Sequence, residues 1–102
     1  MIRRDFEIPK EKVADFCQRH RIRKLALFGS ALREDFGPDS DIDVLIEFEP
    51  GAEVGLIKLA GMELELAELL GTTHRVDLRT PEDLSRHFRD DVMRSAEIQY
   101  AA

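Results

Sequence analysis

Two aspartates at the start of one strand-like run, Asp41 and Asp43, restrict the fold more than any other feature of the chain. Residues 42–48 (IDVLIEF) are rich in β-branched and aromatic side chains, and a Pro-Gly pair follows them, which predicts a strand. Alternate strand residues point to the same face, so the two carboxylates would lie side by side and repel each other. We therefore expect a sheet that presents this pair to a divalent cation.

The expected cation is Mg²⁺, with Mn²⁺ as an alternative. Hard cations choose carboxylate oxygens and complete their shells with phosphate and water. No His or Cys stands beside Asp41 or Asp43, so a zinc site is not expected. Two such ions about 4 Å apart are the usual clamp for in-line nucleotidyl displacement. Asp77, the polar residue of a short apolar strand, is the third candidate ligand, and we expect it to bind the ion that activates the attacking hydroxyl and to give weak general-base help.

A phosphate-binding corner is predicted upstream of these acids. The apolar run 24–29 predicts a strand that ends in Gly29-Ser30, and ten residues separate Ser30 from Asp41. A glycine at a strand-to-helix turn lets a phosphate approach the backbone, and the helix start that follows offers free N–H groups. Ser30 can add a hydroxyl donor, and Arg33, one turn later, can reach the same phosphates.

The remaining segments predict alternating helices and strands. Helices are expected over residues 9–20, over 53–70 with Gly71 ending it, and from Thr80 to about Ala96, and a third strand over 75–79. The predicted fold class is α+β (or α/β): a small mixed β-sheet flanked by helices. No repeat or long linker divides the chain, so we expect one domain over residues 1–102.

The helix predicted at 53–70 carries an unusually wide apolar stripe. Its polar arc (Lys58, Gly61, Glu65 and Glu68) is narrow, and Glu63 falls inside the apolar stripe of roughly 240°. One interpretation buries the helix on two sides and gives Glu63 a partner at the rim. The other makes part of the stripe a docking surface for another protein.

Composition excludes several classes of protein. The chain has 102 residues and a formal net charge of −6, which argues against direct binding of nucleic acid through a basic surface. Cys17 is the single cysteine and is expected in the core, and no apolar stretch approaches the roughly 18 residues of a membrane span. We therefore expect a cytoplasmic protein without membrane contact.

Several other residues are expected to have structural roles. The three histidines, His20, His74 and His87, are scattered over different segments, which is typical of packing or solvent-facing residues. Asp90-Asp91 is expected to be solvated in the last helix, and Tyr100 to pack near the end of the chain.

The stretch LALFGSALREDFGPDSDIDVLIEF resembles the signature of the nucleotidyltransferase superfamily, which includes DNA polymerase β and the aminoglycoside nucleotidyltransferases. More narrowly, the chain resembles the minimal nucleotidyltransferases, antitoxin partners of HEPN-domain ribonuclease toxins, over essentially its whole length. The resemblance implies the palm-like fold of polymerase β. It places the family's glycine-serine pair on Gly29 and Ser30, its metal ligands on Asp41 and Asp43, and its third acid on Asp77.

The same resemblance implies a function. Relatives of this kind bind a cognate HEPN toxin and transfer AMP from ATP to a tyrosine on it, which silences the ribonuclease. Many of them carry an arginine directly after the serine, where this chain has Ala31, and Arg33 is expected to substitute. Two alternatives stay open: an antitoxin that blocks its toxin sterically, and transfer to a small molecule such as an aminoglycoside. Self-association is also left open.

Overall fold

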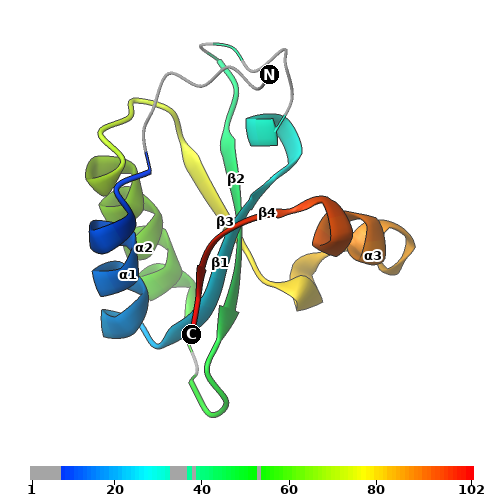
Figure 1. Cartoon of the computed structure of the whole chain (residues 1–102), viewed down its shortest axis with the longest axis horizontal. Helices are drawn as coiled ribbons and strands as arrows, with labels where there is room; N and C mark the ends of the chain where they lie inside the picture. The colour runs from blue at the N-terminus through cyan, green and yellow to red at the C-terminus, as the bar shows by residue number, and fades with distance from the viewer. Residues whose placement is uncertain (1–7, 33–36, 38, 53) are drawn as a thin grey trace.

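The computed structural model describes residues 8–32, 37, 39–52 and 54–102, with the side chains of Ser30 and Ala31 left aside. Helices and strands alternate along these residues (Figure 1). In chain order they are α1 (Lys10–Arg19), β1 (Ile22–Phe28), the 3-10 turn η1 (Gly29–Leu32), β2 (Ile42–Phe48), α2 (Leu56–Leu69), β3 (Val76–Arg79), the 3-10 turn η2 (Pro81–Asp83), α3 (Arg86–Ser95) and β4 (Glu97–Ala101). None of the helices in these ranges has the length and apolarity to cross a membrane.

The strands form one mixed sheet in the order β3-β2-β1-β4. β1 pairs antiparallel with both β2 and β4, whereas β2 and β3 run parallel and are joined through α2. The predicted mixed sheet flanked by helices is therefore confirmed, and β2 has the predicted bounds. The parallel pair matters for function, because it sets Asp77 of β3 beside β2.

Hydrophobic clusters cover both faces of this sheet. α1 and α2 pack together on one face, where they bury Ile42 of β2 within the larger cluster (Figure 1). α3 lies on the other side, and a smaller cluster there contains Phe28, Leu45 and Leu84. Because successive strand residues point to opposite faces, Asp43 lies on the face of Leu45, away from α1 and α2.

The first helix forms as predicted. Pro9 is its N-cap, and Val13, Phe16 and Cys17 are buried against the sheet. Burial raises the pKa of the Cys17 thiol to about 12. The thiol is therefore neutral at physiological pH and behaves as a small core residue, as expected from the sequence.

The last helix begins later than predicted. Pro81–Asp83 form only a single 3-10 turn, in which the Asp83 carboxylate accepts the N–H of Thr80 at 3.2 Å. Leu84 then adopts an extended conformation (ψ 144°) and is buried in the smaller cluster. Ser85 caps α3 anew by accepting the N–H two residues further on. The prediction of one helix from Thr80 is wrong, because the extended backbone that buries Leu84 interrupts the helix at this residue.

The strand β4 was not predicted. It pairs antiparallel with β1, Tyr100 opposite Leu25 and Ile98 opposite Ala26, with a register shift between these two pairs. The segment is too short to show a clear two-residue alternation, and its partners lie 70 to 77 residues earlier in the chain. Tyr100 packs against the larger cluster, in agreement with the packing role expected of it.

The outer face of α2 is apolar and exposed. Met62 and Leu66 face the core, whereas Leu56, Ile57 and Leu64 are 85%, 92% and 75% exposed. The interpretation that α2 is buried on two sides is therefore wrong. We call Leu56, Ile57 and Leu64 the α2 patch.

The start of α2 differs from the prediction, whereas its end and the expected partner of Glu63 are present. The helix starts at Leu56, three residues later than predicted, and ends before Gly71, which has the positive φ (64°) of a helix-terminating glycine. Glu63 has the partner expected for it: its Oε2 accepts the N–H of Leu78 at 2.8 Å. Since β3 is an edge strand, this bond occupies one of its outward-facing donors.

Candidate active site

The β2–β3 pair places two of the predicted acids side by side. Asp43 and Asp77 are register partners in this parallel pair, so their side chains leave the same face of the sheet. Both are partly buried, and Asp77 is 19% exposed. Asp41 lies one residue before β2 and two before Asp43. The arrangement gathers negative charge at the start of β2 and β3.

The segment that carries Asp41 is anchored to the beginning of β3. The N–H of Ile42 donates to the carbonyl of Arg75 at 2.8 Å. His74 is buried, and its Nδ1 lies 2.8 Å from the carbonyl oxygen of Ser40, so this nitrogen carries the proton and donates. These contacts agree with the structural role expected of His74, and they fix the backbone on both sides of Asp41.

Gly29 brings the backbone of the β1–η1 corner against Asp43. It has a positive φ of 63°, and a Cβ added to it would lie 2.5 Å from Oδ2 of Asp43. Only glycine leaves room for the carboxylate in this position. The predicted glycine corner after the strand is therefore present, although the helix is a four-residue 3-10 turn, and the approach of a phosphate to this backbone stays a prediction.

Two predicted phosphate contacts cannot be placed. Arg33 and the side chain of Ser30 lie outside the described part of the chain. Their roles in nucleotide binding stay predictions.

Arg79 is a site residue that the sequence interpretation missed. Its Nε and Nη2 each lie 3.2 Å from Oδ2 of Asp77. The hydrogen bond with Asp77 is the main cause that raises the pKa of Arg79, and the charges of Asp77, Asp83 and Asp43 add to it. The sequence contains one indication of this contact. Residues 77 and 79 are two apart in a predicted strand, so their side chains lie on the same face.

The donor chemistry fits the divalent ions predicted from the sequence. Asp41, Asp43 and Asp77 offer only carboxylate oxygens, the ligands that Mg²⁺ prefers. Within the ranges that the structure describes, no three His, Cys, Asp or Glu side chains are grouped closely enough to ligate one ion as they stand. The three-carboxylate site therefore stays a prediction, and in this structure Asp77 is hydrogen-bonded to Arg79 through one of its two oxygens.

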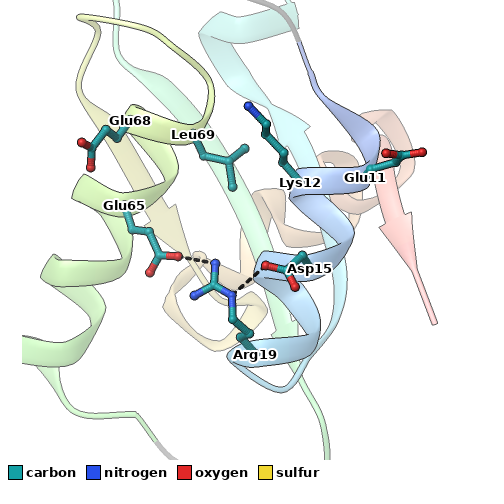
Figure 2. A pocket seen from close by; sticks show the side chains of 7 residues that line it. All are labelled: Glu11, Lys12, Asp15, Arg19, Glu65, Glu68 and Leu69. Atoms are coloured by element: carbon teal, nitrogen blue, oxygen red, sulfur yellow. Dashed lines mark hydrogen bonds and ion pairs between the residues drawn. The ribbon is translucent and has the colours of Figure 1, made fainter.

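A groove of about 520 Å³ lies between α1 and α2, on the other side of the sheet from these acids. Figure 2 shows Arg19 reaching across it to Glu65 while its Nε stays 2.8 Å from Asp15. His20 also contacts Glu65, with 3.0 Å between its Nε2 and Oε1. We attribute this groove to the packing of the two helices and not to nucleotide binding, because Asp43 and Asp77 open onto the opposite face.

Comparisons with known proteins give a family match and several relatives. The family described as nucleotidyltransferase domain matches residues 10–99. The protein adenylyltransferase MntA of Thermococcus cleftensis is 36% identical over 78 residues, which are 76% of this chain and 74% of that protein.

Solved structures share the fold. One, of a protein described as a candidate minimal nucleotidyltransferase, is 37% identical, covers 85% of each chain and gives a TM-score of 0.67. Another, in a complex of a tri-AMPylated HEPN toxin from Shewanella oneidensis with an MNT antitoxin, gives a TM-score of 0.61 at 18% identity, over 91% of this chain and 70% of that one. At that identity the second likeness concerns the fold alone.

Proposed function

This chain belongs to the nucleotidyltransferase domain family, and on that basis we propose that it transfers AMP from ATP to a tyrosine hydroxyl of a HEPN-family ribonuclease toxin, which it thereby neutralises. The observation that carries the proposal is the pairing of Asp43 with Asp77 beside the glycine corner at Gly29. The protein adenylyltransferase relative and the AMPylated toxin of the Shewanella complex support the choice of reaction and of partner.

The chemistry assigned to the site is an in-line displacement at the α-phosphate. The tyrosine oxygen forms a bond to the α-phosphorus while the bond to the bridging oxygen of pyrophosphate breaks, so pyrophosphate leaves. Asp41, Asp43 and Asp77 would hold two Mg²⁺ ions, which supply charge neutralisation at the phosphates when bound. The Asp77 carboxylate would bind the ion that activates the hydroxyl and give weak general-base help. Gly29 keeps the β1–η1 corner close to the Asp43 carboxylate, and the N–H groups of this corner would meet the triphosphate.

The acceptor must be presented by a partner. A 102-residue chain that builds this site has little surface left to enclose a second substrate, and in-line transfer needs the nucleophile held in position. The α2 patch supports docking of the toxin there, because large exposed apolar side chains are typical of interaction surfaces. Gly61 lies in mid-helix beside the patch, and a Cβ there would meet no other part of the chain within 4 Å. Packing within this chain therefore does not explain the glycine, whereas close approach of a partner would.

A second groove extends the α2 patch toward the acids. It measures about 510 Å³, and its lining includes Leu64 and Ala67 of α2, His74 and Arg75 just before β3, and Val76 of β3. The patch and the acids lie on opposite faces of the sheet, and the edge strand β3 separates them. A toxin bound along this groove would reach past the edge of β3, the strand that carries Asp77.

Label transfer tests the proposed reaction directly. We expect ATP labelled at the α-phosphate, with Mg²⁺, to label a cognate HEPN toxin and to abolish its ribonuclease activity. The labelled residue is identified by mass spectrometry and is expected to be tyrosine. If the two proteins bind but the label stays off the toxin, the proposed reaction is wrong.

The docking surface gives a separate prediction. Ile57→Glu with Leu64→Glu should weaken toxin binding at least about tenfold, because each substitution would bury an unpaired polar group in the interface, at a cost of about 1–3 kcal/mol. Both side chains are exposed, so the melting temperature should change little. Titration calorimetry measures the affinity, and Phe88→Glu, an exposed apolar residue of α3, is the matched control. Unchanged toxin affinity in the double variant would remove α2 from the interface.

A further inference from the structure

Arg79 lies among the acids of the site and is not accounted for by the reaction described above. We propose that Arg79 is a movable counter-ion: it holds Asp77 in the nucleotide-free protein and passes to the triphosphate when nucleotide and metal ions bind. The inference rests on the proposed function, because it assigns a substrate-binding role at the same site.

The contact between the two side chains is asymmetric. Both Nε and Nη2 of Arg79 reach the same oxygen of Asp77, each at 3.2 Å. Asp77 is 19% exposed and is fixed on its strand beside Asp43, whereas Arg79 is 49% exposed. The carboxylate is therefore held in place, while the guanidinium is open to solvent on one side and can leave without disturbing the core.

Charge explains why the arginine lies there. The charges of Asp77, Asp83 and Asp43 all act on Arg79, so the guanidinium lies where several carboxylates surround one cation. Without bound metal, the guanidinium supplies part of that charge. A divalent ion that binds Asp77 would lie close to the guanidinium on the same carboxylate, so the two cations would repel each other there.

A bound nucleotide would relieve the repulsion between Arg79 and the metal ion. Once a triphosphate lies beside the acids, its anionic oxygens offer the guanidinium an alternative partner within the same site. Arginine is well suited to this exchange, because its planar fork binds phosphate as readily as carboxylate and stays charged throughout. Metal uptake at Asp77 and nucleotide binding would then be coupled through one side chain.

The test compares two affinities in the full-length Arg79→Ala variant. Binding of Mn²⁺ to the nucleotide-free protein, followed by electron paramagnetic resonance, should become about three- to tenfold tighter, since a partly screened like charge has been removed. Binding of a non-hydrolysable ATP analogue with Mg²⁺, followed by calorimetry, should become about tenfold weaker, since a charged phosphate contact is lost. Arg79→Lys should restore much of the analogue binding because it keeps the charge.

Opposite shifts separate this role from a structural one. A structural defect would weaken both affinities, and Arg94→Ala, which removes an exposed arginine paired with Asp91 on α3, should change neither. The inference is wrong if the Mn²⁺ affinity of Arg79→Ala does not rise, or if its analogue affinity does not fall. If both shift as expected while no AMP reaches the toxin, the proposed reaction fails and the role of Arg79 stands.

Discussion

Replacing both acids at the start of β2, Asp41→Asn with Asp43→Asn, should lower the rate of AMP transfer at least about a thousandfold, because the charge that draws metal ions to the reacting phosphate is lost. The exchange keeps the shape of each side chain and relieves repulsion between carboxylates. The free energy of unfolding should therefore change by less than about 1 kcal/mol. Initial rates of label transfer to the toxin measure the first effect, and thermal unfolding measures the second.

The same variant separates catalysis from steric blocking. Toxin affinity should be unchanged, because the acids lie on the face of the sheet opposite the α2 patch. If binding alone silences the ribonuclease, the variant will neutralise the toxin as well as the wild type does, and the steric alternative is correct. Asp90→Asn with Asp91→Asn, on the exposed face of α3, removes the same number of charges and should leave transfer intact.

Local patterns were sufficient to predict most of the fold. The run Ile42–Phe48 has the composition of a strand and turn residues on both sides, and its bounds agree with the structure. Val13, Phe16 and Cys17 repeat at helical spacing, and they form the buried side of α1. In these segments the local signal and the tertiary environment favour the same structure.

The errors arose where long-range contacts decide the structure. β4 depends on pairing with β1, and the break before α3 depends on burial of Leu84 against two strands. Neither partner is visible in the segment itself. The apolar stripe of α2 was recognised, but whether another part of the chain covers it could be decided only from coordinates.

The candidate site was predictable as a motif but not in its details. Strand spacing was sufficient to place Asp43 and Asp77 on one face once their strands were paired. The contact between Arg79 and Asp77 follows the same spacing, but an arginine at a strand end is more often a solvated residue, so the pattern alone did not single it out. Its significance depends on the neighbouring acids, which only the fold brings together.

Gly29→Ala should combine a loss of stability with a large loss of activity. The left-handed backbone at φ 63° costs a non-glycine residue about 1–2 kcal/mol. In addition, the new Cβ would lie 2.5 Å from Oδ2 and 3.2 Å from Cγ of Asp43, so the carboxylate must move. Displacement of a catalytic group by about 1 Å commonly costs about a hundredfold in rate. We expect AMP transfer to fall by at least that factor, measured by label transfer to the toxin.

Gly71→Ala provides the matched control, because it shares the backbone strain without the clash. Gly71 has nearly the same φ, 64°, but no atom lies within 4 Å of where its Cβ would be. Both variants should therefore lose about 1–2 kcal/mol in the free energy of unfolding from the backbone alone. Only Gly29→Ala should also lose activity, measured at a temperature at which both variants are folded. Equal activity in the two variants would mean that the position of the Asp43 carboxylate does not limit the reaction, and the assignment of Asp43 to the reacting phosphates would then be wrong.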